Sequence, residues 1–160
     1  MILVTVGMQL GFDRLIEAMD ELAPSLDMPV IAQTGRSSYQ PANMEAREKI
    51  APSEFEELVK QSRVIVSHAG IGTVLTAQRL STPIVLFPRR YDFGEHRNDH
   101  QVATVRNLEG RPGVLIAFEQ QELAGRIAEG LELASTRAAL SPTKAQLQSA
   151  IVSFIETGNI

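Results

Sequence analysis

The stretch from Val64 to Pro88 constrains the fold of this chain more than any other part of its sequence. It begins with a short apolar run of β-branched residues and ends with a second apolar run at residues 84–87. A polar turn, SHAGIGT, and a helix-compatible segment at residues 73–80 lie between them. Short apolar runs without polar alternation are typical of strands buried on both faces. We therefore predict a strand–helix–strand unit with parallel strands.

The turn SHAGIGT lies at the carboxyl end of the first of these strands. Ser67, His68 and Thr73 supply polar side chains, and Gly70 and Gly72 leave the backbone open. In an α/β unit, backbone N–H groups and the positive end of a helix converge at this point and favour a phosphate-bearing ligand. The alternative is that the glycines only let the helix and the strand pack closely. Because three polar side chains accompany the glycines, we favour the phosphate-binding interpretation.

Strands and helices alternate along the rest of the chain. We expect N-caps at Asp13 and Ser53, and a linker at residues 135–143. Residues 45–51 fit either a short strand or irregular structure. The other expected strands are 2–6, 29–33 and 114–118, and the other expected helices are 13–22, 54–61, 98–108, 119–133 and an amphipathic closing helix at 145–157. This alternation predicts one domain over residues 1–160, with its core in 1–133, built as a doubly wound parallel α/β sheet.

Composition excludes several classes of protein. The chain has 160 residues, of which 44% are hydrophobic and 21% charged, so we expect a single ordered domain. Its net charge of −4 argues against a protein that binds nucleic acid through its overall field. It has no cysteine, which removes disulfides and thiolate zinc sites. The opening MILVTVG is too short for a secretory signal or a membrane span, so we expect a cytoplasmic protein.

Two further loops follow predicted strands at the same edge of the sheet. The loop GMQLG at residues 7–11 lacks the lysine of a P-loop and the spacing of a dinucleotide fingerprint, so it fits either a tight turn or a ligand loop. The segment RRYDFGEHRNDHQ at residues 89–101 fits either a solvated loop or a substrate-contacting one. Its His96 and His100 are spaced i, i+4 with Glu95 adjacent. We expect no metal site, because His96 precedes the predicted helix and a third ligand is not evident.

The three motifs together, VTVG-x-Q at residues 4–9, SHAGIGT, and PR…FGEH-x-NDHQ, resemble the C-terminal domain of family 28 glycosyltransferases over roughly residues 1–133. The likeness extends to the small catalytic subunits of two-chain enzymes. These include bacterial exopolysaccharide galactosyl- or glucuronosyltransferase pairs and the eukaryotic pair that adds the second N-acetylglucosamine to dolichol-linked sugar. The resemblance implies the Rossmann-like half of a GT-B enzyme, which binds a nucleotide-sugar donor. Because the chain opens at its first strand, we expect the acceptor-binding half to be a separate, membrane-anchored partner.

The resemblance also implies roles for single residues toward a UDP-sugar, which is a donor substrate; it implies no cofactor. His68, protonated or hydrogen-bonding, would stabilise charge on the departing UDP. Thr76 stands where many relatives carry a glutamate that binds the ribose, and the general base would be Glu95, His96, Asp99 or a group of the partner. The implied nucleotide-sugar-binding residues are Gly7, Gln9, Ser67, Gly70, Gly72, Thr73, Thr76, Asn98, His100 and Gln101.

The expected function is that of a catalytic, donor-binding subunit that transfers a hexose from a UDP-sugar to a lipid-linked acceptor. It would act in polysaccharide or glycolipid synthesis, at the inner face of the membrane through its partner. A docking face left open in the isolated chain could also join two copies. The alternatives are a non-catalytic nucleotide-sugar-binding regulatory subunit and an unrelated Rossmann-like hydrolase or epimerase.

Overall fold

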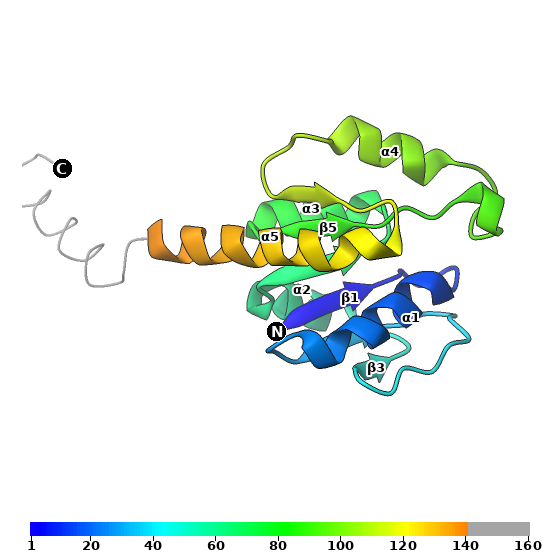
Figure 1. Cartoon of the computed structure of the whole chain (residues 1–160), viewed down its shortest axis with the longest axis horizontal. Helices are drawn as coiled ribbons and strands as arrows, with labels where there is room; N and C mark the ends of the chain where they lie inside the picture. The colour runs from blue at the N-terminus through cyan, green and yellow to red at the C-terminus, as the bar shows by residue number, and fades with distance from the viewer. Residues whose placement is uncertain (141–160) are drawn as a thin grey trace, which may run out of the picture.

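The computed structural model describes residues 1–140 and shows a six-stranded sheet in which every neighbouring pair of strands is parallel. The strand order is β3-β2-β1-β4-β5-β6, which is the order of a Rossmann sheet. The strands are β1 (Ile2–Thr5), β2 (Val30–Gln33), β3 (Glu45–Arg47), β4 (Val64–Ser67), β5 (Ile84–Leu86) and β6 (Val114–Ile116). The helices are α1 (Asp13–Leu22), α2 (Pro52–Gln61), α3 (Ile71–Leu80), α4 (His100–Leu108) and α5 (Gln120–Leu140), with single 3-10 turns at Ala23–Ser25 and Tyr91–Phe93. The predicted doubly wound parallel fold is confirmed (Figure 1).

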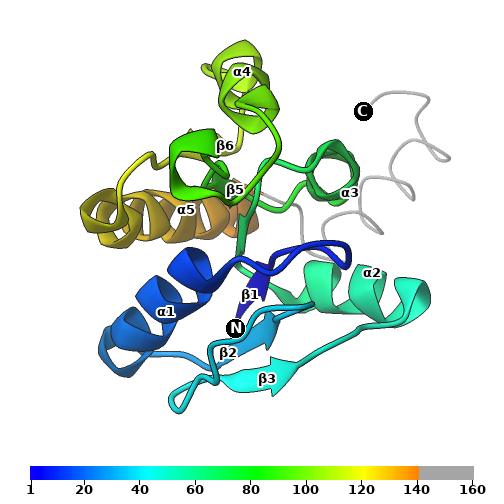
Figure 2. The same ribbon diagram turned by 90° about the vertical axis from the view of Figure 1, so that its right-hand side faces the viewer.

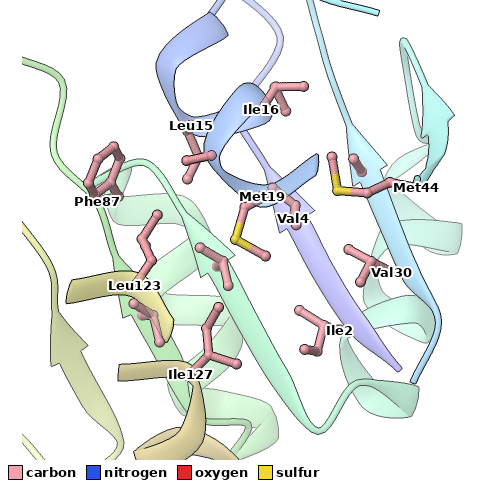
Figure 3. Packing of buried hydrophobic residues seen from close by; sticks show 14 of the residues in the cluster. Ile2, Val4, Leu15, Ile16, Met19, Val30, Met44, Phe87, Leu123 and Ile127 are labelled. Carbon is pink, nitrogen blue, oxygen red and sulfur yellow. The ribbon is translucent and has the colours of Figure 1, made fainter. Parts of the chain in front are cut away.

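Helices cover both faces of the sheet, and each face has its own buried core (Figure 2). On one face, α1 and α5 pack over β1 and β4, where Ile2 and Val4 meet Met19 and Ile127 (Figure 3). On the other face, Leu3 joins a core built with α2, α3 and α4. Successive residues of a strand point to opposite faces, so a strand buried on both sides must be apolar throughout.

The starts of two helices differ from the prediction. The N-cap of α1 is Phe12, and the carboxylate of Asp13 instead accepts the backbone N–H groups of residues 38 and 39, at 2.7 and 3.2 Å. Helix α2 begins at Pro52 with Ala51 as its N-cap, so Ser53 lies inside the first turn. Proline suits the first helical position, because its φ is already helical and it has no N–H to satisfy.

The predicted linker at residues 135–143 is wrong for residues 135–140, which continue α5 beyond the edge of the sheet (Figure 1). Two arginines join this extension to the rest of the fold, Arg63 from the body and Arg137 from the extension itself. Arg63 donates to the carbonyl oxygen of Leu131 and to the hydroxyl of Ser135, and Arg137 donates to the carbonyl oxygen of Ser81. These bonds hold a segment whose composition suggests a linker. The predicted closing helix at 145–157 lies outside the described residues.

The three loops singled out in the sequence follow β1, β4 and β5, which are adjacent in the sheet. Figure 2 views the molecule from the edge where these strands end. The strand order reverses direction between β1 and β4, and ligands of doubly wound sheets bind outside the carboxyl ends of the strands at such a point. Within residues 1–140, no helix is long and apolar enough to span a membrane.

Candidate functional site

The imidazole of His68 lies between two glycines that come from different loops. A Cβ atom placed on Gly70 would stand 2.3 Å from His68 Nε2, and one placed on Gly7 would stand 3.0 Å from His68 Cε1. Gly7 also has a φ of +76°, which a side chain would strain. On its other nitrogen, His68 Nδ1 is 3.4 Å from the Ser67 hydroxyl and 3.5 Å from the carbonyl oxygen of Thr5. Both glycines therefore make room for the ring at the end of β4.

The environment of His68 keeps its imidazole neutral at pH 7. Burial is the main reason that the pKa of His68 falls to about 4, and electrostatic interaction with Arg89 lowers it further. The hydrogen bond with the Thr5 carbonyl group opposes this shift. Of the two forms left open by the sequence, the structure without ligand favours the neutral, hydrogen-bonding one.

Arg89 is a central side chain of this edge that the sequence analysis missed. It is 2% exposed, and its guanidinium donates to the carbonyl oxygens of Val6 (2.7 Å), Leu10 (3.0 Å) and Gly11. Burial lowers the pKa of Arg89 to about 10, with the charge of Glu95 opposing, so the group stays protonated at neutral pH. The available signal was its place in the motif PR…FGEH-x-NDHQ, three residues after the end of β5.

Gln101 connects two of the three loops. Its Oε1 accepts the backbone N–H of Arg89 at 3.0 Å and that of Ala69 at 3.3 Å. Its Nε2 has no hydrogen-bond partner among residues 1–140. The side chain predicted to bind a sugar is therefore fixed by its oxygen and still has two N–H groups to donate.

Two cavities lie on either side of the loop that follows β1. The first, which we call the His68 cavity, has a volume of about 330 Å³, and the second, the Phe55 cavity, has about 470 Å³. Gly7 and Met8 line both cavities. The His68 cavity is also lined by Val6, Gln9, Leu10, His68, Arg89, His96 and Gln101, and the Phe55 cavity by Thr5, Gln33, Ile50, Pro52, Phe55, Glu56, Gly72, Thr73 and Thr76.

The predicted binding residues that line the cavities fall into two groups, and Gly7 and Met8 of the loop after β1 line both cavities. Gly7, Gln9, His68, His96 and Gln101 gather around the His68 cavity, and Gly72, Thr73 and Thr76 line the Phe55 cavity. The first N–H groups of a helix have no carbonyl partner within it, so the first turn of α3 offers donors beside the Phe55 cavity. A nucleotide at this helix N-terminus could extend past Gly7 and Met8 into the His68 cavity.

Four predicted binding residues line neither cavity: Ser67, Gly70, Asn98 and His100. Asn98 and His100 are both exposed, and the side-chain oxygen of Asn98 accepts the backbone N–H of His100 at 3.0 Å. This bond fixes the start of α4. His96 precedes that helix and His100 opens it, so they do not share a helical face. Within residues 1–140, no three histidine, aspartate or glutamate side chains are grouped so that they could hold a metal ion.

Glu95, one of the proposed bases, is engaged in a structural ion pair. Its two oxygens accept Arg14 Nε at 2.7 Å and Arg14 Nη2 at 2.9 Å, and one of them also accepts the backbone N–H of Arg90. The Arg14 guanidinium in turn lies 4.2 Å from the centre of the Phe87 ring. Glu95 lines neither cavity, and its contacts hold the segment after β5.

His96 is the remaining proposed base that lines the His68 cavity, because Asp99 accepts the backbone N–H of Tyr91 outside it. The Nδ1 atom of His96 is buried and has no hydrogen-bond partner within residues 1–140. Buried polar atoms are nearly always paired, so an unpaired one at a cavity wall is a feature that a ligand can satisfy.

Thr76 makes a bond that limits what it can do for a ligand. Its hydroxyl donates to the carbonyl oxygen of Gly72, one turn earlier in α3, at 3.0 Å. The hydroxyl lines the Phe55 cavity and can still accept a hydrogen bond there. The carboxylate that lines the same cavity belongs to Glu56, which also pairs with Arg79 at 2.8 Å.

Comparisons with known proteins agree with this geometry. The model of the glycosyltransferase family 28 C-terminal domain matches residues 1–156. Among solved structures, spinosyn forosaminyltransferase SpnP superposes with a TM-score of 0.60 at 20% identity, over 86% of this chain and 37% of that one. MurG of Acinetobacter baumannii has a TM-score of 0.57 at 18% identity, over 92% and 47%. Spinosyn rhamnosyltransferase SpnG, complexed with thymidine diphosphate, has 0.54 at 19% identity, over 84% and 40%. No curated protein matches significantly.

These likenesses establish the fold, and in each the chain spans less than half of the longer enzyme. The neighbours are GT-B glycosyltransferases, and the matching part is their Rossmann-like half. The fold and the family expected from the three motifs are thereby confirmed. The chain belongs to the family of glycosyltransferase family 28 C-terminal domains.

Proposed function

We propose that this domain binds a UDP-sugar donor and forms the catalytic donor half of a glycosyltransferase that transfers a hexose to a lipid-linked acceptor. The observation that carries the proposal is the position of His68, which lies between Gly7 and Gly70 just before α3 and lines the His68 cavity, while Gly7 lines both cavities. The nucleoside would occupy the Phe55 cavity, against the ring of Phe55. The two phosphates would lie at the first turn of α3, and the sugar would enter the His68 cavity.

The chemistry needed at this site is stabilisation of the leaving diphosphate. As the glycosidic bond breaks, negative charge develops on the phosphate oxygen that leaves the sugar, and donors aimed at that oxygen lower the barrier. The N–H groups at the start of α3 would supply these bonds, and so would His68 Nε2 when it carries a proton. His96, or a group of the partner, would take the proton of the acceptor hydroxyl. Gln101 would bind sugar hydroxyls through its Nε2.

The acceptor half would come from a membrane-anchored partner at the cytoplasmic face. Large apolar side chains are exposed in the three segments that follow β1, β4 and β5: Met8, Leu10, Ile71, Leu75, Tyr91 and Phe93. Met8 and Leu10 line the cavities themselves, and exposed apolar side chains at a ligand-binding edge support docking of another domain there. The chain also spans less than half of the GT-B structures to which it is similar.

Calorimetric titration with UDP tests the proposal, with TDP and uridine as comparison ligands. We expect UDP to bind, uridine to bind much more weakly because it lacks the diphosphate, and TDP to reveal the preference for the base. The absence of measurable UDP binding at millimolar concentration would refute the donor site. With the partner added, His68→Ala and Gln101→Ala should abolish transfer. Unchanged turnover in both variants would favour the non-catalytic, regulatory alternative.

A further inference from the structure

We infer that Arg89 is a positioning residue of the donor site, which acts by fixing the backbone of residues 7–11. The inference rests on the proposed function, because it takes this loop to be one wall of the donor site. Arg89 belongs to the motif PR…FGEH-x-NDHQ, to which the sequence analysis gave no role at this position, and the inference gives it a role that can be separated from general stability.

The hydrogen bonds of the guanidinium span the whole loop. Arg89 Nη2 donates to the carbonyl oxygens of Val6 at 2.7 Å and Leu10 at 3.0 Å, and Nη1 donates to that of Gly11. Val6 precedes the loop, and the other two residues end it. One planar, rigid group therefore holds both ends of the loop at a fixed separation, which a flexible ammonium group cannot do in the same way.

The loop conformation that results leaves backbone donors free beside the His68 cavity. In a trans peptide, the C=O of one residue and the N–H of the next point in opposite directions. The N–H of Phe12, which follows the carbonyl of Gly11, is turned away from Arg89 and donates to the hydroxyl of Ser37 at 2.8 Å. Between the two ends, the N–H groups of residues 8–10 have no hydrogen-bond partner in the described part of the chain. These free donors are suited to phosphate or sugar oxygens.

Arg89 also ties this loop to the other two. Its backbone N–H shares the Oε1 acceptor of Gln101 with the N–H of Ala69, at 3.0 and 3.3 Å. The guanidinium lies 4.6 Å from the centre of the Phe12 ring, and its nearby carboxylate, Glu95, is already paired with Arg14. Arg89 is therefore a buried cation that is bonded to carbonyl groups and not to a carboxylate. Such a cation adds positive electrostatic potential beside a site for a diphosphate.

The conservative variant Arg89→Lys separates positioning from charge, because it keeps the positive charge and loses the planar fork. Its matched control is Arg90→Lys at the next position, where the arginine pairs with the exposed Glu119 at 2.8 Å and lines neither cavity. Titration with UDP should be made at a temperature where each variant is fully folded. We expect UDP to bind Arg89→Lys at least tenfold more weakly than the wild type, and Arg90→Lys to bind it with wild-type affinity.

A purely structural role for Arg89 would lower the melting temperature of Arg89→Lys and leave its UDP affinity unchanged, and that result would overturn the inference. Amide hydrogen exchange and NMR shifts of residues 7–11 give a second, ligand-free measurement. We expect these signals to change in Arg89→Lys and to stay constant in Arg90→Lys. If the wild type fails to bind UDP, the proposed function is refuted, and unchanged loop signals in Arg89→Lys then refute the role of Arg89 separately.

If Arg89→Lys does not fold, the wild-type protein still decides the question. The Nη protons of an arginine bonded to three carbonyl groups exchange slowly and give resolved NMR signals, with through-space contacts to residues 10 and 11. Rapidly exchanging Nη protons without these contacts would overturn the inference.

Discussion

Adding one methyl group at Gly70 should displace His68, and the methyl group added at Gly72 provides the matched control. The new Cβ at Gly70 would lie 2.3 Å from His68 Nε2 and 2.8 Å from Cε1, whereas a Cβ at Gly72 meets no atom within 4 Å. The ring cannot retreat toward the other loop, because Gly7 already stands so close that its own Cβ would lie 3.0 Å away. Gly70 has a φ of −81°, so alanine causes no backbone strain there and the effect comes from the contact.

The size of the effect follows from these distances. Ordinary carbon–nitrogen contacts need at least about 3.4 Å, so the imidazole must move by about 1 Å, and overpacking of this kind costs about 1–3 kcal/mol of unfolding free energy. The displaced ring should be better hydrated, so the pKa of His68 should rise from about 4 toward the usual histidine value. For Gly72→Ala, the helix propensity of alanine predicts a gain of up to about 1 kcal/mol.

Urea unfolding and NMR titration of the histidine side chains measure both quantities. We expect Gly70→Ala to be less stable than the wild type, with a raised pKa for His68, and Gly72→Ala to keep the low pKa. If Gly70→Ala matched Gly72→Ala in both measurements, the packing of His68 between two glycines would be wrong.

Two further predictions concern the free energy of unfolding, one as the pH changes and one after a mutation. Burial lowers the pKa of His68 in the folded state to about 4, so the unfolded chain binds a proton at this residue before the folded protein does. The free energy of unfolding should therefore be highest above about pH 6.5 and fall by about 2–3 kcal/mol as the pH drops from there through 4. In urea titrations, His68→Asn should lose less stability than the wild type between pH 6.5 and 4. Asp20, 3% exposed, accepts the Tyr39 hydroxyl and the backbone N–H groups of Ala42 and Asn43. Asp20→Ala should cost about 2–4 kcal/mol at pH 7 in the same assay, whereas Asp27→Ala should stay close to the wild type.

The sheet and its ligand-binding edge could be predicted from the sequence because their signals are local. Apolar runs such as residues 64–66 and glycine turns such as residues 70–72 report on a few neighbouring residues, and the alternation of strands and helices then determines the topology. Helix ends were less predictable. Ser53 has the right chemistry for an N-cap, yet Pro52 starts α2 one residue earlier. The composition of residues 135–140 concealed a helix that contacts the distant Arg63 and Ser81.

The site was predictable in part for the same reason. Gly7, Gln9, His68 and Gln101 belong to motifs whose position after a strand puts them at one edge. Glu95 and His96 are adjacent in the sequence, yet only His96 lines the His68 cavity. Glu95 instead pairs with Arg14, which lies 81 residues before it. Arg89 was missed for a related reason: its partners are backbone carbonyl groups, which carry no side-chain signature.

A neutral His68 changes which groups stabilise charge at the proposed diphosphate site. In the free protein, Arg89 and the first turn of α3 supply the positive potential, and the charge of Arg89 is itself one reason that His68 stays neutral. A bound diphosphate would oppose the field of Arg89 and raise the pKa of His68, because a nearby anion favours the imidazolium form. The histidine would then gain a proton only when a ligand is present. In the empty site, burial between Gly7 and Gly70 would keep His68 neutral, so the protein would avoid a second buried cation beside Arg89 that no anion compensates.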